Sequence, residues 1–332
     1  MTDSHRILII GTGSIGERHL RCFQSTDRCR LAICEPLIDR RNEVAKRYDV
    51  NGYASWEEAL ASERFTAAVI ASPAAWHIPT AQALTDRGIH LLIEKPLSLN
   101  TDGISKLSAS IKSQETRVSV GFVYRAVPAL QQMRAAVQSE KFGRIVQIQV
   151  QSGQHFPFYR PAYREIYYAD AAQGGGLIQD MLPHFLNLVE WIAGPATKVV
   201  VDAEHKVLPG VDVEDTVNLL SRHGSVMASF TANQHQNVNE SAITLLCEHG
   251  AVRWQLHGHR WFSADEIGGG WTLQQSFDHQ PDDFYIFQAN AFLDLLDGNA
   301  KPLCSFTDGV ATLHSTLAIL KSRKSGSWEF VS

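Results

Sequence analysis

The sequence predicts an α/β protein in two parts. The first is a doubly wound parallel sheet, and the second is an α/β domain built on a large, open, mostly antiparallel sheet. Strand and helix patterns alternate through the first part, which is typical of a parallel sheet with helices on both faces. After Tyr124, strand patterns follow one another across short turns, which indicates antiparallel pairing. The chain of 332 residues is long for a single core. We therefore expect domains at 1–123 and 124–332.

The strands of the first part are short apolar runs that end in glycine, proline or a polar residue. They are expected at 6–10, 30–35, 67–71, 90–94 and 118–121. The segments between them have helical spacing, at 15–23, 39–48, 77–87 and 101–114. This alternation predicts that the carboxyl ends of the strands form one edge of the sheet.

The second part contains a clear alternation of apolar and polar residues at 145–152, which reads IVQIQVQS. Further strands are expected at 198–203, 216–220, 226–232, 242–247 and 252–256. Helices are expected at 129–139 and 309–321, and the last of these suits either domain. An open mixed or antiparallel sheet with a few helices on one face follows from this pattern.

Composition excludes several classes of protein. The 30 Lys and Arg residues against 35 Asp and Glu give a net charge of −5, which does not suit a nucleic-acid surface. No apolar run has the length of a membrane helix, and no signal peptide precedes the first strand, so we expect a cytoplasmic protein. The five cysteines lack C-x-x-C spacing, which favours reduced thiols and no metal site.

The first strand leads into a glycine motif with the G-x-G-x-x-G pattern. Its residues are Gly11, Thr12, Gly13, Ser14, Ile15 and Gly16. In a dinucleotide site, the first glycine permits a tight turn, the second lets a pyrophosphate approach, and the third allows close packing of helix and strand. The phosphates lie at the amino end of the helix. An ordinary glycine turn is the alternative, and the strand and helix around the motif argue against it.

An acidic residue, Glu35, ends the second predicted strand. A carboxylate there accepts hydrogen bonds from a ribose 2′-hydroxyl and repels a 2′-phosphate, so NAD is expected in preference to NADP. Arg40 and Arg41 lie nearby and offer a phosphate site as the alternative, although a solvated helix face explains them better.

Two further motifs carry charged groups. Lys95, in Glu94-Lys95-Pro96, follows a predicted strand at the edge where α/β sheets bind ligands, or is a surface charge in a turn. Asp180 and His184 follow three glycines and share a face if the segment is helical throughout. Since Pro183 suits only a first helical turn, the alternative is that Asp180 is an N-cap and His184 a packed histidine.

Together these motifs resemble the glucose–fructose oxidoreductase / inositol dehydrogenase / MocA (Gfo/Idh/MocA) family. The resemblance rests on GTGSIGERHL, ASPAAWH, GIHLLIEKPLS, GFVYR and GGGLIQDMLPHFLNLVEW, which run along most of the chain. It implies an N-terminal Rossmann domain, a second domain whose sheet forms a homodimer or homotetramer interface, and no membrane partner. It also implies hydride transfer between a nicotinamide cofactor and a carbon that bears a hydroxyl.

The resemblance also implies roles for particular residues. Lys95 matches the lysine that contacts the reacting hydroxyl, and Asp180 and His184 match the pair near the substrate, with the histidine as acid/base. The cofactor set is Gly11, Gly13, Ser14, Ile15, Gly16, Glu35, Ser72, Pro73, His77, Glu94 and Lys95. The chain departs from the family pattern D-x-G-x-H-x-x-D at Leu182 and Asn187.

The segment 154–168, QHFPFYRPAYREIYY, is rich in tyrosine and contains Arg160 and Arg164. Aromatic rings stack on sugars, and arginine binds carboxylate or phosphate, so an anionic substrate group is one expectation. A surface or oligomer-contact loop is the other. The expected substrate-binding set is Arg125, Tyr159, Arg160, Tyr163, Arg164 and Asn187.

We therefore expect an oxidoreductase, with NAD as cofactor and NADP as the alternative, that acts on a secondary hydroxyl or ketone. The substrate is expected to be a sugar, sugar acid, nucleotide sugar or cyclitol. Two other functions fit the same resemblance: cleavage of a glycosidic bond by transient oxidation with tightly bound NAD, and a non-catalytic cofactor-binding regulator. Regulators of that type tend to lose the lysine or the histidine, and this chain keeps both Lys95 and His184.

Overall fold

The structure is a computed structural model that describes residues 5–332. Contacts divide the chain into two units. Unit 1 holds the residues up to Ala126 together with Gln280–Val310, and unit 2 holds Val127–His279 together with Ala311–Ser332. The domain bounds expected from the sequence, 1–123 and 124–332, differ from these units in the placement of Gln280–Val310.

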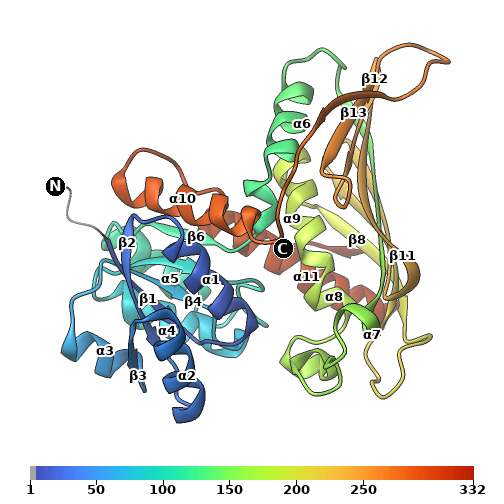
Figure 1. The fold of residues 1–332 in the computed structure, drawn as a ribbon. Coiled ribbons are helices and arrows are strands. Elements are labelled where there is room, and N and C mark those ends of the chain that lie inside the picture. The colour runs from blue at the N-terminus through green and yellow to red at the C-terminus, as the bar shows by residue number, and fades with distance from the viewer. Residues whose placement is uncertain (1–4) are drawn as a thin grey trace. The chain divides into compact units, whose positions relative to one another are not determined.

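Unit 1 has, among the described residues, one six-stranded sheet in the order β3-β2-β1-β4-β5-β6 (Figure 1). All of its strand pairs are parallel. The strands are β1 (His5–Ile10), β2 (Cys29–Cys34), β3 (Asn51–Tyr53), β4 (Ala67–Ile70), β5 (His90–Ile93) and β6 (Val118–Val120). The strand order reverses between β1 and β4, which is the point where doubly wound sheets bind ligands. The predicted doubly wound sheet is confirmed.

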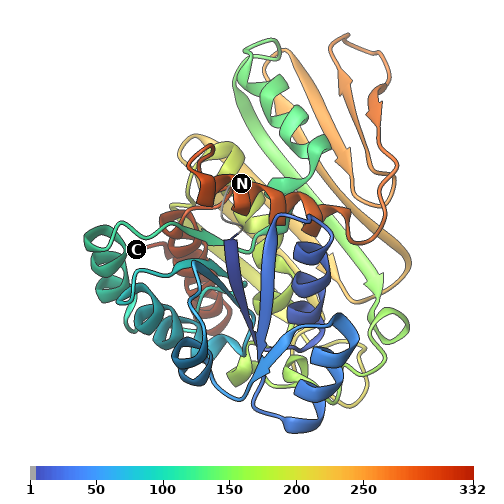
Figure 2. The same ribbon diagram turned by 60° about the vertical axis from the view of Figure 1, so that its left-hand side comes forward.

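Helices lie on both faces of this sheet (Figure 2). They are α1 (Ser14–Gln24), α2 (Ile38–Tyr48), α3 (Trp56–Ser62), α4 (His77–Thr85) and α5 (Ile104–Ser113). Ile7, Ile9, Val69 and Leu92 have no exposed surface, because strands covered on both faces bury alternate and adjacent side chains alike. The sequence analysis missed β3 and α3, since β3 is only three residues long and contains a glycine.

Helix α10 (Asp283–Asp297) explains why a late segment belongs to unit 1. Its Phe292 packs edge-on against Phe23 of α1, with ring centroids 6.1 Å apart, inside the core of the parallel sheet. Arg28 forms an ion pair with Asp294 at 2.8 Å. The sequence analysis did not identify this helix, because its apolar side chains are completed by a core that lies more than two hundred residues earlier in the chain.

Unit 2 has, within the described part of the chain, a nine-stranded sheet in the order β14-β13-β12-β11-β7-β10-β9-β8-β15. The strands are β7 (Ile145–His155), β8 (Lys198–Glu204), β9 (Thr216–His223), β10 (Val226–Asn233), β11 (His235–Cys247), β12 (Gly250–Gln255), β13 (Arg260–Ala264), β14 (Thr272–Ser276) and β15 (Glu329–Phe330). Strands β7 and β10 pair in parallel and the other pairs are antiparallel. The predicted open, mostly antiparallel sheet is confirmed.

The longer helices of unit 2 lie on one face of its sheet (Figure 1). They are α6 (Pro128–Gln138), α9 (Leu182–Ala193) and α11 (Phe306–Ser325), the last of which begins in unit 1. Two short helices, α7 (Phe156–Tyr159) and α8 (Leu177–Asp180), follow β7 and precede α9. Side chains on the covered face, such as Ile148, Phe230 and Ile243, are buried. On the other face Leu220 and Met227 are about half exposed.

Candidate functional site

The glycine motif forms the turn between β1 and α1. Gly11 has φ +86°, and a Cβ there would lie 2.8 Å from Ala71 O, so both its conformation and its surroundings require glycine. A Cβ on Gly16 would lie 1.9 Å from Gly11 O. A Cβ on Gly13, in contrast, would meet no atom of residues 5–332 within 4 Å. The fold itself therefore does not require Gly13 to be glycine, and the open space beside it fits a ligand that approaches the backbone closely.

The amino end of α1 presents backbone N–H groups to this space. Gly13 is the N-cap residue, and no side chain among the described residues caps the helix. Ser14 is exposed and Ile15 is half-buried, so both backbones are near the surface. Free N–H groups and the helix dipole suit an anion, and this arrangement fits the pyrophosphate of a dinucleotide.

Glu35 lies directly after β2 and is buried against the glycine motif. Its Oε2 accepts hydrogen bonds from Thr12 N at 3.1 Å and from Thr12 Oγ1 at 2.9 Å, and its Oε1 accepts one from Leu37 N at 3.1 Å. A carboxylate has about four lone-pair positions, so it can still accept a ribose hydroxyl. Arg41 donates to Glu35 O and Pro36 O, which agrees with its interpretation as part of the helix surface.

The turn after β4 brings two predicted residues together. Ser72 Oγ is buried and has no hydrogen-bond partner within residues 5–332, as expected of a group that a ligand satisfies. The His77 ring is 2% exposed and lies between two carbonyl oxygens, with Nε2 2.8 Å from Ser72 O and Nδ1 2.9 Å from Pro96 O. Burial lowers the pKa of His77, although both contacts oppose that effect. His77 therefore ties the β4 and β5 turns together, whereas Pro73 is exposed.

The turn after β5 carries Glu94, Lys95 and Pro96 at the carboxyl edge of the sheet. Glu94 is buried, and its Oε2 accepts a hydrogen bond from Lys95 N at 3.0 Å. Lys95 is half-buried. The position of Lys95, at the edge where doubly wound sheets bind ligands, is the one that the sequence predicts.

In unit 2, the segment with Asp180 and His184 is two helices and not one. Helix α8 ends at Asp180, Met181 forms the joint, and α9 begins at Leu182 with Pro183 in its first turn. The alternative in which Asp180 is an N-cap is therefore wrong, because Met181 holds that position. Asp180 and His184 are both half-buried, and Oδ1 of Asp180 accepts a hydrogen bond from the Tyr167 hydroxyl at 2.7 Å.

The three glycines before α8 allow a close approach of chain segments. A Cβ on Gly175 would lie 2.2 Å from Tyr168 O, and Gly176 has φ +88° with its Cβ position 2.5 Å from Glu214 Oε1. Glu214 is buried, and its Oε1 accepts a hydrogen bond from Ile178 N at 3.0 Å. The glycines thus let Glu214 and the tyrosine segment fix the start of α8, which carries Asp180.

The tyrosine-rich segment is partly core and partly surface. Tyr163 is 1% exposed, and its hydroxyl donates to Pro209 O at 2.6 Å, so we remove Tyr163 from the substrate-binding set. Arg164 stacks over the Tyr163 ring and donates from Nε to Pro209 O at 2.7 Å. Tyr159 and Arg160 are exposed, and they remain available to a ligand.

Two other expected substrate residues are buried. Arg125 donates to Leu303 O at 3.1 Å and to Asp308 at 3.0 Å, and so fixes the late segment of unit 1. Asn187 is 1% exposed and donates from Nδ2 to Thr312 Oγ1 at 2.9 Å. For both, burial in the described structure replaces the expectation of a ligand contact, because the sequence does not reveal which way a polar side chain on a helix or turn faces.

The hydroxyl of Thr312 also explains why residue 187 is an asparagine. Thr312 Oγ1 donates its single hydrogen to Glu190, which also accepts from Ser315 Oγ. Because this hydrogen is used, Thr312 Oγ1 accepts in its contact with residue 187, and residue 187 acts as the donor there. The amide of Asn187 meets that requirement and the family's carboxylate does not.

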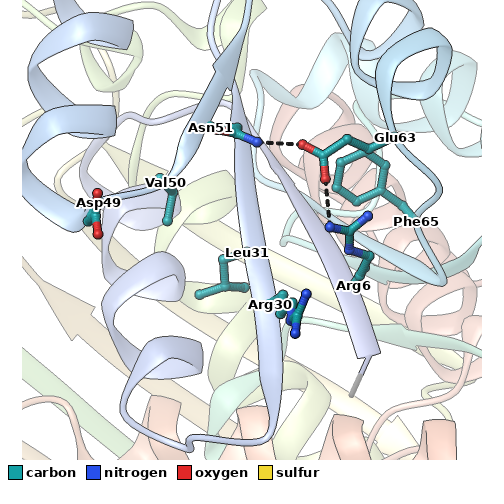
Figure 3. Close-up of a pocket in the computed structure, with 8 residues that line it drawn as sticks. All are labelled: Arg6, Arg30, Leu31, Asp49, Val50, Asn51, Glu63 and Phe65. Carbon is teal, nitrogen blue, oxygen red and sulfur yellow. Dashed lines mark hydrogen bonds and ion pairs between the residues drawn. The ribbon is translucent and has the colours of Figure 1, made fainter. Parts of the chain in front are cut away.

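A small polar depression lies elsewhere on unit 1 (Figure 3). Arg6, Arg30 and Asn51 from the starts of β1, β2 and β3 line it, together with Glu63, which binds Arg6 and Asn51. It therefore lies at the amino edge of the sheet, opposite the glycine motif, and is separate from the site described above.

Among residues 5–332 no group of three His, Cys, Asp or Glu side chains is placed to hold a metal ion.

The sequence does not single out two side chains that contact predicted site residues: His19 contacts Glu94 in unit 1, and Tyr167 contacts Asp180 in unit 2. His19 lies on the buried face of α1 three positions after Gly16, and Tyr167 lies in the segment noted for its tyrosines. The hydrophobic spacing of α1 is a signal for the buried position of His19.

In the described part of the chain, no helix is both long and apolar enough to cross a membrane.

Comparison with family models gives two matches. Residues 5–122 match the model described as "Oxidoreductase family, NAD-binding Rossmann fold", and residues 130–253 match the "GFO/IDH/MocA C-terminal domain". The two matches correspond to the sheet of unit 1 and to the first part of unit 2. The sheet of unit 1 is therefore an NAD-binding Rossmann domain.

Individual proteins are similar at lower identity. An uncharacterized oxidoreductase of Synechocystis sp. is 28% identical over 200 residues, which are 59% of this chain and 53% of that protein. Inositol 2-dehydrogenase of Corynebacterium glutamicum is 27% identical over 247 residues, 66% of this chain and 69% of that protein. The chain thus spans about half the length of the first and somewhat over two thirds of the second.

The fold is shared with a solved structure over its full length. The WlbA dehydrogenase from Bordetella pertussis, in complex with NADH and UDP-GlcNAcA, aligns with a TM-score of 0.85 at 22% identity. The alignment covers 100% of this chain and 99% of that one.

Proposed function

The chain belongs to the Gfo/Idh/MocA family of oxidoreductases, and we propose that it is an NAD-dependent dehydrogenase acting on a secondary hydroxyl of a sugar, sugar acid, nucleotide sugar or cyclitol. The observation that carries the proposal is the placement of Lys95 at the carboxyl edge of the NAD-binding sheet, in the turn held by Glu94. In such sheets this edge is where a substrate meets the cofactor.

We propose that the cofactor's phosphates bind at the glycine motif, over Gly11, Gly13 and Gly16, with Ser14 and Ile15 supplying backbone N–H groups. Glu35 then binds the adenosine ribose and makes NAD the preferred cofactor, with NADP used less well. Support comes from the three hydrogen bonds that hold this carboxylate, since they leave it in place for a ribose hydroxyl and against a phosphate.

When bound, NAD supplies the acceptor or donor of a hydride. Lys95 donates a hydrogen bond to the substrate hydroxyl and stabilises the negative charge that develops on that oxygen. His184 takes the hydroxyl proton on its imidazole, which suits a base that works near neutral pH. Asp180, held on one oxygen by Tyr167, orients the imidazole or binds the substrate.

The substrate class follows from the exposed part of the tyrosine-rich segment. Tyr159 offers an aromatic face to a sugar ring, and Arg160 offers a guanidinium to a carboxylate or phosphate. The relatives named above include an inositol dehydrogenase and a structure with UDP-GlcNAcA, one neutral and one anionic ligand. We propose an anionic sugar or nucleotide sugar, because Arg160 is exposed.

Two cellular properties belong to the same proposal. The five cysteines are free thiols, which supports a reducing, cytoplasmic location. The face of the nine-stranded sheet that carries Leu220 and Met227 supports assembly into a homodimer or homotetramer.

A substrate screen tests the proposal. The purified protein is incubated with NAD or NADP and with sugars, sugar acids, inositols and nucleotide sugars, and NADH or NADPH formation is followed by absorbance. Net NADH formation on an anionic sugar or a nucleotide sugar is the expected result, with slower turnover of a neutral sugar or cyclitol. Release of a sugar from a glycoside without net NADH formation would point to the glycoside-cleaving reaction. Cofactor binding without turnover of any class would point to a regulator.

A further inference from the structure

A buried histidine and a buried glutamate form a close pair inside unit 1. His19 Nε2 lies 2.6 Å from Glu94 Oε1, and the two side chains are 1% and 5% exposed. His19 comes from α1, the helix that the glycine motif begins, whereas Glu94 comes from the turn after β5. The pair therefore joins the phosphate-binding helix to the turn that carries Lys95.

The fold makes room for this pair at a specific glycine. A Cβ on Gly121, after β6, would lie 2.6 Å from Glu94 Oε1. Gly121 has an ordinary backbone conformation that any residue can adopt, so its lack of a side chain serves the space that Glu94 occupies. The His19 ring is enclosed further by Phe23 and Tyr285, with ring centroids 6.3 Å and 5.7 Å away.

Glu94 is ionised in these surroundings. Burial by itself would raise the pKa of Glu94, but the hydrogen bond and charge of His19 and the charge and N–H of Lys95 outweigh burial, so the pKa lies below its ordinary value. A carboxylate accepts only, so the His19 Nε2–H donates to Oε1 while the Lys95 N–H donates to Oε2. His19 Nδ1 is buried and has no partner among residues 5–332. The histidine therefore acts on Glu94 through one N–H only.

We propose that His19 is a positioning residue for Lys95: it fixes Glu94, and Glu94 fixes the backbone of Lys95. The role of Lys95 in the reaction rests on the proposed function, whereas the mechanical link from His19 to the Lys95 amide does not. Loss of the His19 N–H leaves Glu94 a buried carboxylate without its side-chain partner, and such a group reorients toward water or takes up a proton. Either change releases the Lys95 amide.

Hydrogen exchange of the Lys95 amide tests this link without any substrate. In His19→Leu we expect the Lys95 amide to exchange about 10- to 100-fold faster than in the wild type, measured by mass spectrometry on a peptide that covers the β5 turn. His19→Gln is the rescue variant, because its amide N–H can donate to Glu94, and its exchange should stay close to the wild-type rate. Glu94→Gln, which keeps the side-chain shape, has one acceptor oxygen for two donors and should give an intermediate rate.

A matched control is available in unit 2. His223 is also buried, and its ring contacts Gly194 O and Ser221 Oγ, so His223→Leu removes comparable contacts without touching the Lys95 turn. The Lys95 amide should exchange at the wild-type rate in this variant. If it exchanges equally fast in the wild type and in folded His19→Leu, or if His19→Gln behaves as His19→Leu does, the proposed link is wrong. Should His19→Leu fail to fold, the comparison of Glu94→Gln with the wild type decides.

Kinetics then separate the link from the proposed function. With a substrate from the screen, His19→Leu should lower kcat about 10-fold and change the KM for NAD by less than about 3-fold, with His19→Gln near the wild type. If no substrate is found, the exchange experiment still supports or overturns the positioning role, and only the proposed reaction is in question. A normal kcat in His19→Leu with a released Lys95 amide would overturn the claim that the link serves Lys95.

Discussion

Each of the two units uses one buried glutamate to hold the turn that carries a predicted catalytic residue. In unit 1, Glu94 accepts the Lys95 N–H on one oxygen and the His19 N–H on the other. In unit 2, Glu214 accepts the Ile178 N–H on one oxygen and the Arg323 guanidinium on the other. In both units a glycine makes the space, since Gly121 and Gly176 would each place a Cβ within 2.6 Å of the glutamate.

The two glutamates differ in the side chain that contacts them and in the access of that side chain to solvent. The His19 side chain is 1% exposed, whereas the Arg323 side chain is 33% exposed. Arginine keeps its charge at every working pH, and a histidine does not. In both units a buried glutamate accepts a backbone N–H in a turn that carries a predicted catalytic residue. Its second contact is fully buried in unit 1, whereas water partly screens it in unit 2.

The largest effect is expected when the proposed catalytic residues are removed. Lys95→Ala in unit 1 and His184→Ala in unit 2 should each lower kcat by on the order of 10²-fold or more, because each removes a group that acts on the transferred proton or the developing charge. Steady-state kinetics with the substrate from the screen measure this, and NADH fluorescence should show nearly unchanged cofactor binding. Near-normal turnover in either variant would remove that residue from the mechanism.

Breaking the two glutamate contacts should lower the free energy of unfolding by different amounts in the two units. His19→Leu should lower the free energy of unfolding by about 3–5 kcal/mol, because it strands a fully buried carboxylate. Arg323→Leu should cost only about 1–2 kcal/mol, since solvent reaches the arginine side and the Ile178 N–H remains in place. Urea denaturation of the two variants measures the difference. Equal losses would contradict the distinction that we draw between the units.

A substitution at Asn187 tests the hydrogen bonds that join α9 to Thr312 of α11 in unit 2. Asn187→Asp, which introduces the family's carboxylate, should destabilise the protein by roughly 1–3 kcal/mol, because the Thr312 hydroxyl already donates to Glu190. Thermal unfolding of the variant checks this, and Asn187→Ala serves as the control that removes the donor without adding a charge. A more stable aspartate variant would overturn our account of residue 187.

Acid should weaken the unit 1 contact in a predictable direction. The folded pKa of Glu94 lies below its ordinary value of 4.5, so its ionised form contributes stability above that value, and this contribution is lost as pH falls through the folded pKa. The titratable groups that face Glu94 are His19, Lys95, His77 and Tyr285. Glu94→Gln should therefore lose less stability than the wild type as the pH falls from about 5 through the folded pKa of Glu94. Parallel curves for the two proteins would mean that Glu94 does not titrate in this way.

The smallest effect concerns the cofactor. Glu35 accepts a hydrogen bond from Thr12 Oγ1 in unit 1, much as Glu190 accepts one from Thr312 in unit 2, but only Glu35 lies against the glycine motif. The wild type should have a lower KM for NAD than for NADP, and Glu35→Ala should narrow the difference by several-fold, as it removes the repulsion of a 2′-phosphate. Glu190→Ala is a control whose cofactor ratio should stay unchanged. A lower KM for NADP in the unmutated protein would refute the assignment of Glu35.

Three residues that the sequence assigns to substrate binding are buried in the structure, and the reason is the same for each. Tyr163, Arg125 and Asn187 have side chains that suit a substrate, yet each is buried against residues distant in the chain. Helix α10 escaped notice because its apolar face is completed by the core of unit 1. Residue type and spacing predict that a side chain is able to bind a substrate. They do not predict whether a residue distant in the chain already forms a hydrogen bond with that side chain.

Features that depend on local chain properties can be predicted from the sequence alone. The apolar runs of β1, β4 and β5, the glycines at positions 11 and 16 and the carboxylate after β2 follow from periodicity and backbone conformation, which neighbouring residues encode. The partners of the buried glutamates, in contrast, become visible only in the folded chain. His19 and Glu94 are 75 residues apart, and Glu214 and Arg323 are 109 apart, so no local pattern records either contact. Such partners are selected because a buried charge must be satisfied wherever the finished fold places it.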